Sequence, residues 1–155
     1  MAALLMPLKP PTVSWQRWYL TGAVFGVLPD LDMLWFYWVD HRQFHHHVYF
    51  THWPIVWLGL GGLAVAWWRM RRSEASVYAV LLAAIGMVHV VMDSVVGDIG
   101  WFKPWDDVLY SWFEVTNRYS PWQLNFIIHW SFALELVIVA LAVLKWRQTK
   151  INFHR

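Results

Sequence analysis

Two aspartates, Asp30 and Asp32, lie in a stretch that otherwise has no charged residue. The stretch runs from 18 to 39 and is long enough to cross a bilayer. Because a carboxylate at membrane depth costs about 2.5–3.5 kcal/mol on insertion scales, two of them need a strong partner. A multivalent cation is such a partner, so the pair predicts a metal-binding site.

The spacing of these two aspartates is wrong for one helical face. Pro29 precedes them and removes a backbone hydrogen bond, which loosens the turn. Both carboxylates could then bind metal. Alternatively, one could bind the metal while the other orients a metal-binding histidine without contacting the ion. Pairing with Arg42 or Lys103 is the structural alternative.

A second candidate pair is His89 and Asp93, which are four positions apart in an apolar segment. On a helix this spacing places both side chains on one face, where they can hold one ion. The alternative is a His–Asp hydrogen bond between helices.

Further histidines precede the second long apolar segment. His47 and His52 flank its start and are expected ligands, His52 being nearly intramembrane. His45 and His46 are expected to be solvated, although one histidine of this run could move a proton near neutral pH. His41 is ambiguous.

Two ionisable residues lie in the last apolar segment. His129 and Glu135 are six positions apart and so occupy different helix faces. His129 is a candidate proton donor. Glu135 lies near mid-depth, where we expect a protonated or hydrogen-bonded carboxyl group.

The composition indicates a membrane protein. Of the 155 residues, 59% are hydrophobic and 14% are charged, against about 25% charged in soluble domains. The chain has no cysteine, so metal ligands must be oxygen or imidazole nitrogen. No basic patch interleaved with aromatic residues is present, which argues against a nucleic-acid partner.

Four apolar segments have the length of membrane spans. With no linker or repeat between them, residues 1–155 are expected to form one all-α integral membrane domain, a four-helix bundle. Two spans plus buried soluble helices is the alternative. The expected spans are 17–39, 49–68, 75–97 and 124–146.

The basic residues predict the orientation. Nine lie on the side of both termini and three on the other, which favours cytoplasmic termini in an inner membrane. The candidate site residues then face outward. The nine are Lys9, Arg17, Arg69, Arg71, Arg72, Lys145, Arg147, Lys150 and Arg155, and the three are Arg42, Lys103 and Arg118.

Residues 98–124 form the one long loop between the expected spans. Asp106 or Asp107 could cap a short interfacial helix over 108–113, since Pro104 prevents a helix throughout. Its aromatic residues favour the headgroup level. The loop is expected to be an interfacial anchor, or else a lid or lipid-headgroup platform.

The order of these motifs resembles the YdjM-like family of membrane-bound metal-dependent hydrolases. Typical members have Pro-Asp-x-Asp, His-Arg-Gly-x-Thr-His-Ser, His-x3-Asp and an aromatic-Pro-aromatic element. The resemblance runs from about Gly22 to Trp105. The four motifs correspond to residues 29–32, 47–53, 89–93 and 101–105.

Three positions depart from that pattern: Val48 replaces the arginine, Tyr49 the glycine and Trp53 the final serine. If the arginine binds an anionic substrate, this chain must use another cation or have another substrate. The cations available are Arg42, Lys103 and Arg118. The family is similar to the helical zinc-dependent phospholipases C, which implies a phosphoester substrate.

The sequence therefore predicts a membrane-embedded hydrolase with a divalent metal centre of zinc, or else manganese. Six ligands are more than one tetrahedral ion binds, so two ions bridged by Asp93 or Asp30 are expected. The ions would supply hydroxide from bound water. His46 or His129 would protonate the leaving group. The expected ligands are Asp30, Asp32, His47, His52, His89 and Asp93.

The expected partners are membrane lipids and an amphiphilic phosphoester substrate. Two other classes stay open. In a metal-ion or proton transporter the ionisable residues would line a path, and in a non-catalytic assembly protein the metal would only hold the helices together.

Overall fold

The computed structural model describes residues 9–115, 118–121 and 123–153. It is all-α: the described residues contain no strand, only an isolated backbone bridge between Ile99 and Tyr110. The chain forms two compact units, residues 1–111 and 112–155, which are described separately.

The first expected span is broken into three pieces. Helix α1 (Trp15–Val27) begins after Ser14, whose Oγ accepts from the backbone of Arg17. It ends before Pro29, which has no N–H to donate to the carbonyl of Phe25; Leu28 donates there instead, at 3.4 Å. The 3₁₀ helix η2 (Pro29–Leu31) and helix α2 (Asp32–Trp38) follow.

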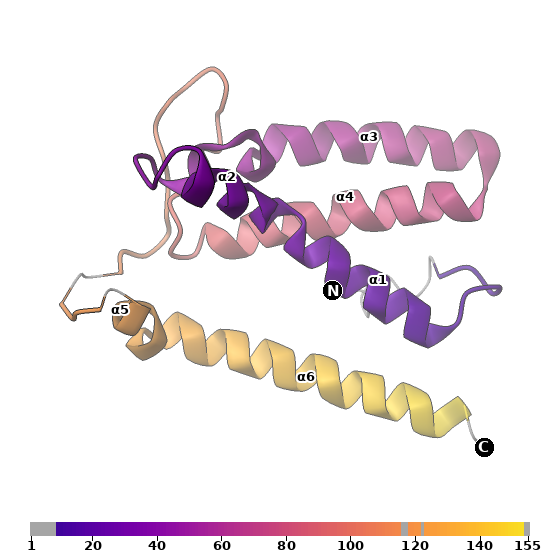
Figure 1. The fold of residues 1–155 in the computed structure, drawn as a ribbon. Helices are drawn as coiled ribbons and strands as arrows, with labels where there is room; N and C mark the ends of the chain where they lie inside the picture. Colours follow the sequence, from indigo (N-terminus) through magenta and orange to yellow (C-terminus); the bar gives the residue numbers. More distant parts are fainter. Residues whose placement is uncertain (1–8, 116–117, 122, 154–155) are drawn as a thin grey trace. The chain divides into compact units, whose positions relative to one another are not determined.

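The second and third expected spans form a helical hairpin (Figure 1). Two 3₁₀ turns, η3 (His46–Val48) and η4 (Phe50–His52), lead into helix α3 (Pro54–Arg71). Helix α4 (Glu74–Asp93) returns beside it after a left-handed Arg72, with Ser73 as its N-cap. The regular helix of the second span thus begins five residues later than expected, at Pro54.

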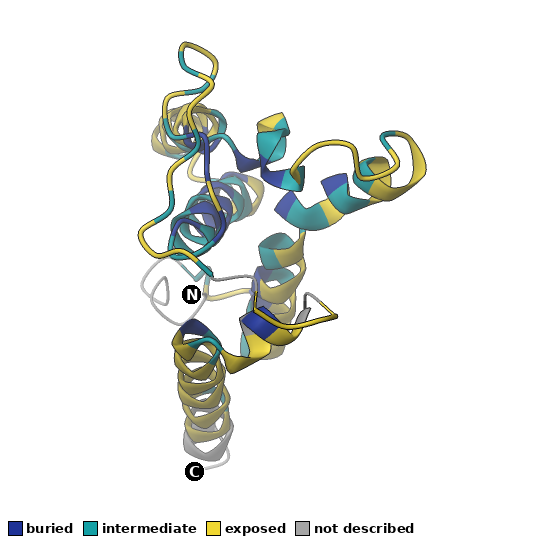
Figure 2. Ribbon diagram, turned by 90° about the vertical axis from the view of Figure 1, so that its left-hand side faces the viewer, coloured by how far each residue is buried: buried dark blue, intermediate teal, exposed yellow. Residues whose placement is uncertain are grey.

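Small residues allow these helices to pack closely. A Cβ on Gly86 of α4 would lie 2.2 Å from the ring of Trp57 on α3, so the indole occupies the space above the glycine. Helix α1 packs against α4 through the core of Trp18, Val77, Leu81 and Ile85. Figure 2 shows buried residues where these helices face one another.

The loop after α4 differs from the expectation. No helix forms over 108–113. Ile99 and Tyr110 instead exchange two backbone hydrogen bonds of 2.9 Å, which require extended backbone at Tyr110. Asp106 does accept a bond from the backbone of Val108, but as a turn. The predicted interfacial helix is therefore wrong.

The second unit contains helix α5 (Gln123–Ile128) and helix α6 (Trp130–Phe153). Together they cover the fourth expected span, with an interruption at His129. Most described side chains of α6 are exposed (Figure 2).

Among the described residues, one helix is long and apolar enough to cross a membrane, namely α4. Helices α1 and α2 have 13 and 7 residues and fall short individually.

Candidate metal centre

Four side chains from three segments converge at one end of the α3–α4 hairpin. His89 Nε2 lies 3.0 Å from Asp93 Oδ2 and 3.4 Å from Asp30 Oδ1. His52 Nε2 lies 3.5 Å from the same Asp93 oxygen and 3.7 Å from the same Asp30 oxygen. We call this set, Asp30, His52, His89 and Asp93, the first metal site.

Three atoms of this site are buried without a hydrogen-bond partner among the described residues. They are His52 Nε2, His89 Nε2 and Asp93 Oδ2. Buried polar atoms are nearly always satisfied, so three of them facing one another need an explanation. Ligand atoms around a tetrahedral zinc ion are about 3.3 Å apart, given bonds of 2.0–2.1 Å. The spacing and the donor types fit a divalent ion.

The far nitrogens of the histidine rings have acceptors. His52 Nδ1 lies 2.7 Å from Asp32 Oδ2, and His89 Nδ1 lies 2.8 Å from the carbonyl oxygen of Gly26. With a proton on each Nδ1, each Nε2 presents a lone pair toward the oxygen of Asp93. Acceptor would then face acceptor, an arrangement that requires a positive charge between them. Metal-binding histidines are commonly oriented in this way.

Asp32 lies behind His52, on the side of the ring away from Asp30. Its Oδ2 atom accepts from Thr51 Oγ1 and from His52 Nδ1, and the carboxylate is buried. Of the two roles that the sequence left open, this placement fits the orienting one. The prediction of Asp32 as a direct ligand has no support from these contacts.

His47 lies beside the first metal site. Its Nδ1 bonds to the carbonyl oxygen of Gly97, and its Nε2 is 3.9 Å from Asp93 Oδ2. Burial, reinforced by the positive charge of neighbouring His46 and His52 when protonated, lowers the pKa of His47 to about 2. The ring is therefore neutral at physiological pH, the form that binds metal.

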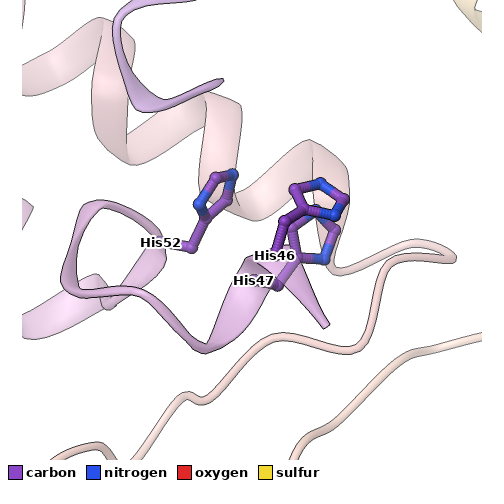
Figure 3. Close-up of side chains that lie close together, drawn as sticks. All are labelled: His46, His47 and His52. Atoms are coloured by element: carbon purple, nitrogen blue, oxygen red, sulfur yellow. The ribbon is translucent and has the colours of Figure 1, made fainter. Parts of the chain in front are cut away.

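His46 is drawn into the cluster rather than left in solvent. Its ring centroid is 3.9 Å from that of His47 and 5.5 Å from that of His52. Figure 3 shows the three rings grouped at the 3₁₀ turns. Burial is the main cause that lowers the pKa of His46. His46 is thus half-buried, where the sequence predicted a solvated imidazole.

Local backbone features position these groups. The break at Pro29 turns the chain so that Asp30 and Asp32 reach opposite sides of one imidazole. The turns η3 and η4 compress the segment so that His47 and His52 meet. The 3₁₀ turns between the α-helices and the last turns of α4 therefore build the site.

Three positioning residues were not found from the sequence. Gly26 and Gly97 supply carbonyl acceptors, and Thr51 contacts Asp32. A Cβ on Gly97 would lie 2.6 Å from His47 Cε1 and 2.6 Å from the carbonyl oxygen of Asp93, which explains glycine there. Of these three residues, only Thr51 could have been found from the sequence, because it belongs to the Thr-His motif.

The other candidate residues have different contacts. His129 belongs to the second unit, where its Nδ1 is 2.9 Å from Ser131 Oγ. Arg42 lies over the ring of Tyr37, and Lys103 pairs with Asp107. The described contacts give neither Arg42 nor Lys103 an aspartate of the metal centre as partner, so the alternative pairing of Asp30 and Asp32 with these cations is wrong.

Comparison with curated proteins and with solved structures gave no match. A protein-family profile described as YdjM inner membrane protein matches residues 1–154. The match extends beyond the motifs, which end at Trp105, and covers nearly the whole sequence. The chain belongs to the YdjM inner membrane protein family.

Proposed function

We propose that this protein is a membrane-embedded, metal-dependent hydrolase that cleaves a phosphoester of a lipid or lipid-linked substrate. The observation that carries the proposal is the convergence of His52 Nε2, His89 Nε2 and Asp93 Oδ2, all buried and without a hydrogen-bond partner among the described residues. Asp30 stands at the open side of this group, since its side chain is 44% exposed whereas that of Asp32 is 5% exposed.

Asp30, His52, His89 and Asp93 would hold a divalent metal, zinc being the first choice for a set of imidazole and carboxylate ligands. Such an ion supplies Lewis acidity, which activates water at neutral pH and offsets charge on a phosphoryl group. Asp32 and the carbonyl groups of Gly26 and Gly97 keep the histidine rings in position. The roles of His46 and His129 as proton donors stay predictions.

The placement of the site supports a substrate at the membrane surface. His52 lies two residues before the start of α3 and Asp93 ends α4, so the site lies at one end of the hairpin. Arg69, Arg71 and Arg72 lie at its other end. By the excess of basic residues on the cytoplasmic side, the site faces outward from an inner membrane, at headgroup depth.

The same proposal includes four spans with both termini in the cytoplasm. Large exposed apolar residues support lipid contact beyond α4, among them Leu20 and Val24 of α1, Leu58 and Leu63 of α3, and Leu141 and Leu144 of α6. The phosphoester as substrate class comes from the resemblance to zinc-dependent phospholipases C.

The test uses purified wild type, Asp93→Asn and Asp107→Asn in lipid nanodiscs. Asp107 is an exposed carboxylate paired with Lys103, so its variant controls for the same chemical change. Bound metal is counted by elemental mass spectrometry, and phospholipids and isoprenoid phosphates are screened for hydrolysis. Wild type and Asp107→Asn should bind zinc and release product, whereas Asp93→Asn should do neither.

Bound metal without hydrolysis of any of these phosphoesters would contradict the proposed activity and favour a metal that only holds the helices together. Zinc movement into sealed vesicles, abolished in Asp93→Asn, would favour transport. Wild type that is folded and metal-free after growth with zinc would contradict the metal centre itself.

A further inference from the structure

The three histidines at the 3₁₀ turns offer a second set of metal ligands. His46, His47 and His52 each have a ring nitrogen within 4.8 Å of those of the other two (Figure 3). The first metal site provides its own set, Asp30, His52 and His89, by the same measure. The two sets share only His52, so His46 and His47 lie outside the first set.

The His46 ring is fixed in place by its neighbours. The ring of His45 stacks on it with centroids 5.2 Å apart, and the ring of Phe36 lies 5.9 Å away. Among the described residues, none forms a hydrogen bond to a His46 ring nitrogen. The ring is therefore held by packing while its nitrogens stay available to a ligand.

One shared group can serve both sets, and it is not His52. Each imidazole nitrogen has one lone pair and binds one ion, and His52 Nδ1 is engaged by Asp32. A carboxylate can bind two ions. Asp93 Oδ2 lies 3.0 Å from His89 Nε2 and 3.9 Å from His47 Nε2, so it lies between the two sets.

We infer that His46 and His47 hold a second divalent cation beside the first metal site, with Asp93 as the bridging carboxylate. Two imidazoles and a carboxylate are a donor set that zinc accepts, with a position left for water. The inference rests on the proposed first metal site. It gives His46 the role of a ligand in place of the proton donor expected from the sequence.

The experiment counts metal and follows Co²⁺ binding in wild type, His46→Ala, His46→Gln, His89→Ala and His41→Asn. His41 is an exposed histidine with φ of 48°, a conformation that asparagine tolerates, so its variant is the matched control. Metal-free protein in detergent is titrated with Co²⁺, whose visible absorption reports nitrogen and oxygen ligation. Circular dichroism and gel filtration check that each variant is folded.

Wild type and His41→Asn should bind two equivalents. His46→Ala and His46→Gln should each bind one and lose part of the Co²⁺ absorption. His89→Ala should lose the other equivalent or both.

A folded His46 variant that keeps the wild-type metal content would overturn the inference. One equivalent in wild type, lost in His89→Ala but kept in His46→Ala, would leave the first metal site standing and remove the second. Two equivalents without hydrolysis would contradict the proposed activity and support both sites.

Discussion

The Oδ2 atom of Asp32 lies 2.7 Å from Nδ1 of His52, and the imidazole separates it from Asp30, whose Oδ1 is 3.7 Å from Nε2. Two carboxylates only two positions apart therefore contact opposite nitrogens of one ring. This arrangement divides their roles: Asp30 faces the first metal site, and Asp32 orients its central ligand.

Substitution Asp32→Asn should weaken zinc binding about 10- to 100-fold, the usual cost of losing a carboxylate that orients a metal-binding histidine. The number of ions bound at saturating zinc should not change. A competition titration against a chromophoric chelator measures the affinity, and elemental analysis measures the number. Loss of an equivalent would instead identify Asp32 as a ligand.

Substitution Pro29→Ala should also lower zinc affinity, by about tenfold or more, while keeping helical content. Alanine restores an N–H that can donate to Phe25, so α1 can continue through η2 and turn the two aspartates away from His52. Pro11→Ala, in an exposed position before α1, is the matched control and should bind zinc like wild type. Equal affinities in the two variants would show that the break is not needed.

Substitution Gly97→Ala should destabilise the protein by about 1–3 kcal/mol, as overpacking does, and should weaken metal binding. The new Cβ would lie 2.6 Å from His47 Cε1, so the ring must shift from its present position beside the first metal site. Gly59→Ala in α3, whose Cβ meets nothing within 4 Å, should be neutral or stabilising. Thermal denaturation in detergent and zinc titration check both variants. Unchanged zinc affinity in a destabilised Gly97→Ala would show that Gly97 contributes to stability but not to metal binding.

Removing metal with a chelator should lower the melting temperature of wild type, and added zinc should restore it. A ligand at 100 times its dissociation constant stabilises the folded state by about 2.7 kcal/mol. Asp93→Asn should melt at one temperature with or without chelator, because it lacks the negative charge of the carboxylate whose Oδ2 lies 3.0 Å from His89 Nε2 and 3.5 Å from His52 Nε2. Wild type that is insensitive to chelator and retains no metal would contradict the metal centre.

Much of the fold followed from local patterns in the sequence. Helix α4 lies within one residue of the expected start at 75, because an uninterrupted apolar run with Ser73 as N-cap has one stable local structure. The segment 108–113 was mispredicted for the opposite reason. Its apolar residues have helical spacing. The structure is decided instead by the two backbone hydrogen bonds that Tyr110 makes with Ile99, a partner eleven positions away.

The sequence by itself determined the membrane family and which residue types could bind metal, because composition, the Pro-Asp-x-Asp element and the His-x3-Asp spacing are local features. Only the tertiary structure decided which atoms meet. The different contacts of Asp30 and Asp32, the carbonyl acceptors of Gly26 and Gly97, and the approach of His46 to His52 depend on how α1, α4 and the 3₁₀ turns pack. Backbone carbonyls have no sequence signature, so contacts made through them become visible only once the helices have packed.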